Sequence, residues 1–173
     1  MRIISGKWRG RRITAPAGGA VRPTGDRVRE SWMSIVHQSL PDARVLDLCA
    51  GSGALGLEAL SRGAAGCDFV EQSPEVLAGI RTNLAQLGGH PGAHLYREDA
   101  VRFVTGLSAG AYDVAFADPP YSTDTVRQLV ECWMAVPFAN VFGIEHASSV
   151  LLPAVGETRR YGTASLTFFR APS

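Results

Sequence analysis

The chain has 173 residues, of which 46% are hydrophobic and 19% are charged. This length fits one domain, and this composition excludes a disordered or fibrous chain. No apolar stretch reaches the ~20 residues that a membrane helix requires, and residues 1–10 lack the apolar core of a signal peptide. We therefore expect a soluble, cytoplasmic protein that makes no membrane contact.

Cysteine and histidine patterns do not predict a structural bridge or a metal site. The three cysteines are odd in number and show no C-x-x-C spacing. His90 and His94 are four residues apart, but Pro91 and Gly92 between them would break a helix that aligned the two rings. We expect neither a disulfide framework nor a bound metal.

Positive charge is concentrated at the start of the chain. Residues 1–30 contain eight basic and two acidic side chains, a net charge of +6, whereas residues 31–173 contain nine basic and 14 acidic side chains, a net charge of −5. This asymmetry favours a polyanionic partner, although a solvated arm without a partner would look the same. The arginine-rich composition suits phosphate binding, and Trp8 is a candidate platform for a base. The predicted RNA-binding residues are Arg2, Lys7, Arg9, Arg11, Arg12, Arg22, Arg27 and Arg29.

The first predicted elements are two short strands at 2–5 and 11–14, joined by a turn between Gly6 and Gly10. A linker rich in glycine and proline follows at 15–21. The prediction therefore divides the chain into a small basic β-hairpin with its linker, 1–21, and a main domain, 22–173. Thr24 or Asp26 begins a helix that runs to about Gln38.

Strands and helices alternate through the main domain. The predicted strands are 44–49, 67–71, 94–97, 113–117 and 141–146, and the predicted helices are 54–62, 74–87, a short one after 99, and 123–134. Two further strands, 157–161 and 165–170, form a closing antiparallel hairpin. This pattern predicts an α/β fold with a mostly parallel seven-stranded sheet and helices on both faces. Such sheets bind ligands beyond the carboxyl ends of their strands.

A glycine-rich turn follows the first strand of the main domain. Gly51, Gly53 and Gly56 match G-x-G-x-x-G, and Glu71 lies 20 residues after Gly51, which fits an NAD enzyme as an alternative. Asp47, however, precedes the glycines on the strand and would disfavour a pyrophosphate there. Acidic side chains at three successive strand ends suit the ammonium and sulfonium of S-adenosylmethionine better. The third of them, Asp99, has two interpretations: a contact to the adenine amino group or a helix N-cap.

The fourth strand ends in Asp118-Pro119-Pro120-Tyr121. The prolines fix the backbone, so that the Asp118 carboxylate and the Pro119 carbonyl form two rigid acceptors for the hydrogens of an exocyclic amine. Tyr121 can stack on the ring that bears this amine. The four residues are therefore the predicted catalytic site of an amino-methyltransferase, in which geometry brings the amine and the methyl group together.

Other polar and aromatic residues carry weaker signals. His146, beside Glu145 at the fifth strand end, is a candidate substrate contact, or else a polar residue that caps the strand. Arg81 and Asn83 fall on a predicted helix as ordinary surface residues. Trp133 and Met134 are predicted core residues.

The motifs together resemble the RsmD family of class I methyltransferases, which modify the N2 of a guanine in 16S ribosomal RNA. The resemblance rests on 1–7, on 22–30, on 46–63 and on the Asp118–Tyr121 tetrapeptide, with similar patches at 144–146 and 160–162. It implies S-adenosylmethionine as cofactor, the RNA or the assembling small subunit as partner, and an Arg22–Glu30 segment over the entrance. The predicted cofactor-binding residues are Thr24, Asp47, Cys49, Ala50, Gly51, Gly53, Glu71, Gln72, Asp99 and Ala100.

Two features depart from the family pattern. Cys49 stands where an aromatic residue is more common, and the basic residues are almost all arginine. The remaining alternatives are a methyltransferase on DNA adenine or on a protein glutamine, the NAD-dependent oxidoreductase and a non-catalytic RNA-binding module. The prediction is for a monomer, and the modified nucleotide stays open.

Overall fold

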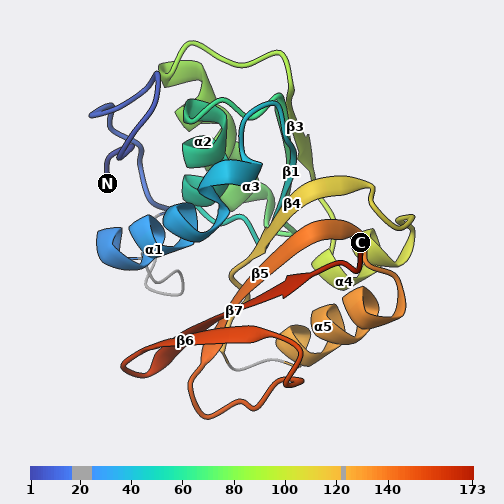
Figure 1. Ribbon diagram of the computed structural model, residues 1–173. Helices are drawn as coiled ribbons and strands as arrows, with labels where there is room; N and C mark the ends of the chain where they lie inside the picture. Colours follow the sequence, from blue (N-terminus) through green and yellow to red (C-terminus); the bar gives the residue numbers. More distant parts are fainter. Residues whose placement is uncertain (17–24, 122–123) are drawn as a thin grey trace.

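The computed structural model describes residues 1–16, 25–121 and 124–173. One seven-stranded sheet forms its centre, with the strand order β3-β2-β1-β4-β5-β7-β6 (Figure 1). The first five strands along the chain are parallel, and β7 lies antiparallel between β5 and β6. The bounds are β1 Arg44–Leu48, β2 Gly66–Val70, β3 Ala93–Tyr96, β4 Tyr112–Ala117, β5 Ala139–Ala147, β6 Glu157–Tyr161 and β7 Ala164–Arg170. This confirms the predicted sheet and its C-terminal hairpin.

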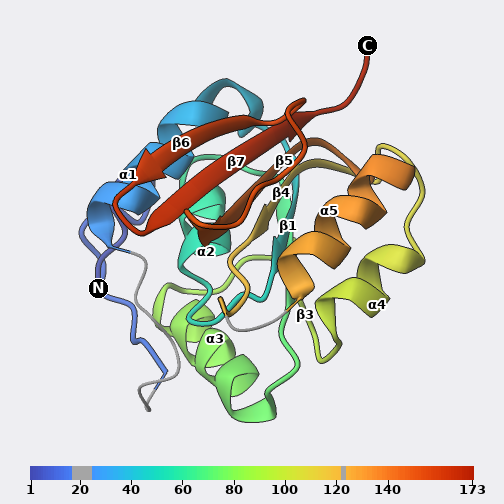
Figure 2. The ribbon, with the colours of Figure 1, turned by 90° about the horizontal axis from the view of Figure 1, so that it is seen from below.

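Helices cover both faces of the sheet (Figure 2). One face carries α1 Asp26–Val36, α2 Ala54–Ser61 and α3 Pro74–Gln86, and the other carries α4 Ala100–Thr105 and α5 Thr125–Ala135; a short 3₁₀ helix, His37–Ser39, follows α1. Because strand side chains alternate between faces, neighbours such as Val45 and Leu46 enter separate hydrophobic clusters. Each cluster therefore fixes one layer of helices.

Close packing explains one glycine of the fingerprint. A Cβ atom at Gly56 would overlap the Phe69 ring and the Cys67 sulfur. Glycine at this position lets α2 lie directly against β2, and the contact holds the preceding turn at the end of β1.

The N-terminal segment is an irregular form of the predicted β-hairpin, in which the N–H groups of Ile3 and Ile13 donate to the carbonyls of Arg11 and Met1 across the two arms. Within the described residues its two arms form a single antiparallel bridge, between Arg2 and Arg12, and no regular strands. The backbone N–H groups of Ile4 and Ser5 donate to the Glu58 carboxylate of α2, at 3.0 and 2.9 Å, instead of to the opposite arm. Strand pairing between the two arms therefore ends at Ile4, whose N–H group donates to α2.

The same segment packs onto the main domain. Ile3, Trp8 and Ile13 are buried in the cluster that includes α1 and α2. The boundary expected between residues 21 and 22 falls outside the described residues and stays a prediction.

Candidate active site at the carboxyl edge of the sheet

The β1–α2 turn forms the first wall of the site. Gly51 and Gly53 adopt φ values of 57° and 80°, which favour glycine, and allow the chain to turn tightly from strand to helix. The backbone N–H of Gly56 donates to the Asp47 Oδ2 atom at 2.9 Å. Asp47 is 1% exposed, and this burial raises the pKa of its carboxyl group. This hydrogen bond thus holds the start of α2 against the end of β1.

Glu71, directly after β2, forms the second wall. Its two carboxylate oxygens accept hydrogen bonds from the backbone N–H groups of Gly51, at 3.2 Å, and Ser73, at 2.9 Å. These contacts hold the carboxylate beside the glycine-rich turn. Gln72, the next predicted residue, is exposed.

The acidic side chains of four strand ends converge on Cys49. Burial raises the pKa of the Cys49 thiol first, followed by the negative charges of Glu71, Asp118, Asp47 and Asp99. The four carboxylates are thus close enough to Cys49 for their charges to act on its thiol, which makes this part of the carboxyl edge acidic. Such a region suits a cationic ligand and disfavours a pyrophosphate.

Asp99 at the end of β3 is the N-cap of α4. Its side chain accepts a hydrogen bond from the Arg102 backbone N–H at 2.9 Å, and the following residue, Ala100, is buried. This is the second of the two interpretations of Asp99. A contact to the adenine amino group stays a prediction.

The tetrapeptide after β4 lies beside the glycine-rich turn. The Asp118 backbone N–H donates to the Leu48 carbonyl at 3.4 Å, since β4 pairs with β1 up to Leu48 and Ala117. Pro119 is buried, which fixes its place at the edge. The Tyr121 hydroxyl donates to the Glu145 Oε1 atom on β5 at 3.2 Å. The sheet therefore brings together the predicted cofactor turn and the predicted target-base residues.

Glu145 is a site residue that sequence reasoning placed only as the neighbour of His146. The structure favours the structural interpretation of His146, whose side chain is buried and whose Nε2 atom lies 2.7 Å from the Thr167 hydroxyl. The alternation of strand side chains directs the two residues to opposite faces, and only Glu145 reaches Tyr121.

The predicted RNA-binding residues separate into two groups. Arg29 is fully buried, where it donates to the Arg2 carbonyl at 2.7 Å and to Asp26 at 2.9 Å, so its assignment to RNA is wrong. Trp8 is also buried and cannot be a base platform. Arg22 and Thr24 lie outside the described residues. The exposed members of the predicted set are Arg2, Lys7, Arg9, Arg11, Arg12 and Arg27.

Two buried polar residues were not recognised from the sequence. Asn83, predicted at the surface, is 0% exposed and binds both backbone groups of Thr14 and the Ser52 carbonyl. Asn83 lies three residues after the buried Ile80 on α3, and this helical spacing could have indicated that both face the core. Glu58 lies in an almost entirely apolar helix, and such helices are buried on all sides.

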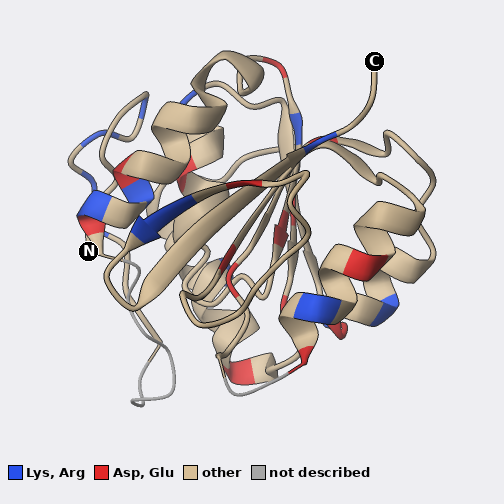
Figure 3. Ribbon diagram, turned by 60° about the horizontal axis from the view of Figure 1, so that its bottom comes forward, with Lys and Arg blue, Asp and Glu red and all other residues tan. Residues whose placement is uncertain are grey.

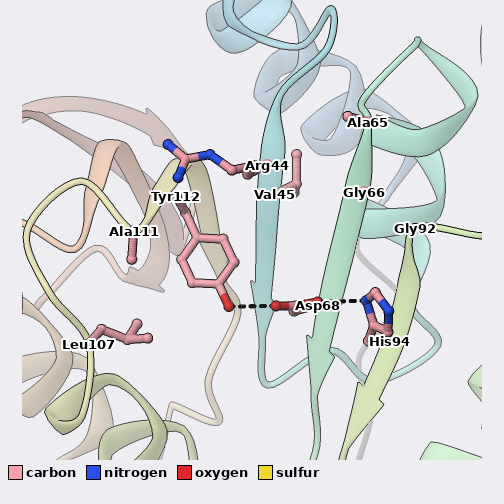
Figure 4. Close-up of a pocket in the computed structure, with 10 residues that line it drawn as sticks. All are labelled: Arg44, Val45, Ala65, Gly66, Asp68, Gly92, His94, Leu107, Ala111 and Tyr112. Carbon is pink, nitrogen blue, oxygen red and sulfur yellow. Dashed lines mark hydrogen bonds and ion pairs between the residues drawn. The ribbon is translucent and has the colours of Figure 1, made fainter.

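A cleft of about 380 Å³ lies at the opposite, amino edge of the sheet (Figure 4). Its Asp68 carboxylate accepts from the Tyr112 hydroxyl at 2.6 Å and contacts the His94 Nδ1 atom at 3.2 Å. The chain's own side chains satisfy this carboxylate, so the cleft is not the candidate active site. Among the described residues, we find no group of three potential metal ligands and no helix with the length and apolar character to span a membrane.

The strand order, with β7 inserted antiparallel, and the acidic carboxyl edge define a class I methyltransferase fold. Solved structures share it: "Putative methyltransferase yhhF" from Escherichia coli aligns with a TM-score of 0.84 and 31% identity over 98% of this chain and 97% of that one. The Thermus thermophilus RsmC enzyme, in complex with AdoMet and guanosine, has the same fold at a TM-score of 0.70 and 19% identity, over 95% of this chain and 46% of that one.

The chain belongs to the family described as "Conserved hypothetical protein 95", whose model matches residues 1–168. "Putative rRNA methyltransferase YlbH" of Bacillus subtilis is 35% identical over 98% of both chains. Ribosomal RNA small subunit methyltransferase D of Escherichia coli K12 is 38% identical over 75% of this chain and 65% of its own length. These matches confirm the resemblance to the RsmD family and support rRNA methylation. S-adenosylmethionine as cofactor agrees with the fold, which the chain shares with the RsmC structure that contains AdoMet.

Proposed function

We propose that this protein transfers a methyl group from S-adenosylmethionine to the exocyclic N2 of a guanine in small-subunit (16S) ribosomal RNA. The observation that carries the proposal is the hydrogen bond between the Asp118 N–H and the Leu48 carbonyl. It joins the rigid acceptor pair directly to the strand that opens into the glycine-rich turn. A bound amine and a bound methyl donor would then be neighbours.

The residues of the carboxyl edge fit S-adenosylmethionine. The acidic surroundings of Cys49 complement the two positive charges of S-adenosylmethionine. Gly51 and Gly53, which have positive φ values, carry no side chain and expose their backbone at the turn. Asp47 and Gly51 would hold the methionine part, Glu71 the ribose, and Asp99 with Ala100 the adenine. When bound, this cofactor supplies an electrophilic methyl group.

The Asp118 carboxylate and the Pro119 carbonyl orient the amine. The nitrogen lone pair of an exocyclic amine is delocalised into the ring, so the amine is a weak nucleophile. Two fixed acceptors draw its N–H groups out of the plane and direct the lone pair toward the methyl group. They also stabilise the positive charge that develops on nitrogen. The departing proton passes to Asp118 or to water.

Tyr121 and Glu145 support the target base. The hydrogen bond from the tyrosine hydroxyl to Glu145 holds the ring in one orientation, in which it can stack on the base. A base within an RNA helix must leave its stack to reach such a pocket. The exposed arginines of the N-terminal segment would hold phosphates and make the affinity depend on salt.

Methyl transfer to small ribosomal subunits that lack the modification tests the function directly. Radioactive S-adenosylmethionine should label their RNA, and mass spectrometry should locate the label on one guanine N2. Labelling of DNA or of a protein glutamine instead, with no labelling of the RNA, would overturn the proposal. Calorimetry with S-adenosylhomocysteine and with NAD separates the methyltransferase from the oxidoreductase, because we expect heat only from the former.

A further inference from the structure

The C-terminal segment of the chain is basic, like the N-terminal one. Residues 148–173 contain three arginines and one glutamate, a net charge of +2, whereas residues 31–147 contain six basic and 13 acidic side chains, a net charge of −7. In the structure, basic residues on β6, on α1 and on the N-terminal segment gather along one side of the molecule (Figure 3). Basic residues from both ends of the chain thus lie on the same side of the molecule.

Two of these arginines, Arg159 and Arg160, lie on the edge strand β6, and both are exposed. β6 runs antiparallel to β7, which runs antiparallel to β5, so β6 ends at the same carboxyl edge as β5. The two arginines are the third and fourth residues of this five-residue strand. Both therefore lie near the carboxyl edge of the sheet. Because strand side chains alternate, Arg159 is on the face of Glu145 and Arg160 on the face of His146.

Strand register places Arg159 close to the target-base residues. Arg159 pairs with Leu166 on β7, and Leu166 pairs with Glu145 on β5. Directly paired residues point to the same face, and two strand spacings of about 4.8 Å separate Arg159 from Glu145 by roughly 10 Å. Glu145 in turn binds the Tyr121 hydroxyl. An RNA strand whose base lies on Tyr121 would pass within reach of β6.

The present contacts of both arginines leave them able to bind phosphate. Arg159 pairs with Glu157 at 3.1 Å, but their side chains are 51% and 61% exposed, and such surface pairs contribute only about 0–1 kcal/mol. Arg160 donates to the Ser148 carbonyl at 3.3 Å, which occupies one of the donors of a guanidinium group that has five. The carbonyl orients this guanidinium without neutralising it.

The tip of the N-terminal segment lies elsewhere. The Lys7 backbone N–H donates to the carbonyl of Ser61, the last residue of α2, at 2.9 Å. Because α2 begins at the glycine-rich turn and runs back along the sheet, this tip is near the amino edge. Lys7 and Arg9 are therefore farther from Asp118 than the β6 arginines, despite the higher charge of their segment.

We propose that Arg159 and Arg160, one on each face of the edge strand β6, bind the phosphate backbone of the substrate RNA where it crosses this edge beside the target nucleotide. This inference rests on the proposed RNA substrate and adds a contact at the opposite end of the sequence from the predicted basic arm. Arginine suits the role because its planar fork binds a phosphate through two hydrogen bonds.

The test compares Arg159→Ala/Arg160→Ala with Arg81→Ala/Arg170→Ala, in which two exposed arginines are also lost, one on α3 and one at the amino-edge end of β7. For the β6 variant we expect the KM for undermethylated small-subunit RNA to rise about tenfold and the slope of log affinity against log salt to fall by about 1.5–2, one unit per phosphate contact. The control should keep the wild-type values. S-adenosylhomocysteine affinity and circular dichroism should be unchanged in both.

Arg159→Lys/Arg160→Lys separates charge from folding, and it should retain most of the salt slope. Equal KM and slope for the β6 variant and the control would overturn the inference, and so would a loss of slope in the lysine variant as large as in the alanine variant. If the wild-type protein transfers no methyl group to RNA, the proposed function fails. Filter binding of the same RNA then still decides whether the β6 arginines contact phosphates.

Discussion

Acidic side chains lie at both edges of the sheet, but their hydrogen-bond partners differ. At the amino edge, Asp113 on β4 binds Arg44, which lowers the pKa of the Asp113 carboxyl group, and Asp68 on β2 is held by Tyr112 and His94 (Figure 4). At the carboxyl edge, Asp47 and Glu71 accept hydrogen bonds from backbone N–H groups. Within the described part of the chain, neither is in an ion pair.

This difference separates the carboxylates that the fold pairs with its own side chains from those that we propose for the cofactor. A carboxylate that is paired with a side chain has its charge balanced within the fold. The Glu71 carboxylate accepts hydrogen bonds from N–H groups instead, which leaves its negative charge available to attract a cation, whereas burial raises the pKa of Asp47 and disfavours its charged form. β2 and β4 therefore offer matched controls. Each contains an aspartate, Asp68 or Asp113, and each is followed by an acid of the carboxyl edge, Glu71 or Asp118.

The largest effect is expected on β4. Asp118→Ala should lower the rate of methyl transfer by about 100-fold or more, because the amine loses one of its two fixed acceptors. Calorimetry should show that S-adenosylhomocysteine still binds. Asp113→Ala, in the same strand, should retain methyl transfer. Undiminished turnover of the Asp118 variant would refute its role in orienting the amine.

Glu71→Gln, directly after β2, should weaken the binding of S-adenosylhomocysteine by about 10- to 100-fold, the equivalent of ~1.5–3 kcal/mol for hydrogen bonds to a charged group. Asp68→Asn, three residues earlier, should leave this affinity unchanged. Calorimetric titration of both variants measures the difference. Equal losses of affinity would mean that the two edges do not differ in function.

Glu58 is a buried acid with a structural role. It is 0% exposed, and its carboxylate accepts from the Ile4 and Ser5 N–H groups and from Arg62 at 3.1 Å. Glu58→Ala leaves these donors without their acceptor and should reduce the free energy of unfolding by about 1–3 kcal/mol. Urea denaturation measures this loss.

The cleavage of residues 1–16 by a protease measures the same effect locally, since the carboxylate anchors this segment. Glu75→Ala on α3, an exposed acid, is the control and should change neither measurement. A Glu58 variant as stable as the wild type would show that the N-terminal segment is held by its apolar contacts alone.

The smallest effect is a pH dependence. Burial lowers the pKa of His146 below its usual 6.5, so the unfolded chain takes up a proton there before the folded chain does. The contribution to stability is therefore lost as the pH falls below 6.5, until the lowered pKa of the folded state is reached. The slope cannot exceed about 1.4 kcal/mol per pH unit for one proton.

Urea unfolding of the wild type and of His146→Gln between pH 7.5 and 5 measures this dependence. The difference in unfolding free energy between the two proteins should change with pH in that direction. A pH-independent difference would contradict the assignment of a neutral, buried imidazole.

Much of the fold and of the site was predictable because their signals are local. The alternation of strand and helix patterns predicted the seven strands and their order of appearance. Asp47, Glu71 and Asp118 were recognised because they stand at strand ends, and parallel strands place such ends at one edge. The prolines at 119 and 120 fix their own backbone, so the rigid corner could be inferred without any distant contact.

Local sequence patterns were thus sufficient to predict the strands of the sheet, the carboxyl edge as the candidate site and the uneven charge along the chain. The burial of charged residues and their distance from the carboxyl edge required the three-dimensional fold. Arg29 looked like an RNA contact, but it lies on the buried side of α1, where it donates to the Arg2 carbonyl. Glu58 accepts hydrogen bonds from residues more than 50 positions away. Arg159 reaches the active-site side only through the pairing of β6 with β7 and of β7 with β5. Burial and proximity of this kind depend on contacts between distant residues, which no local pattern records.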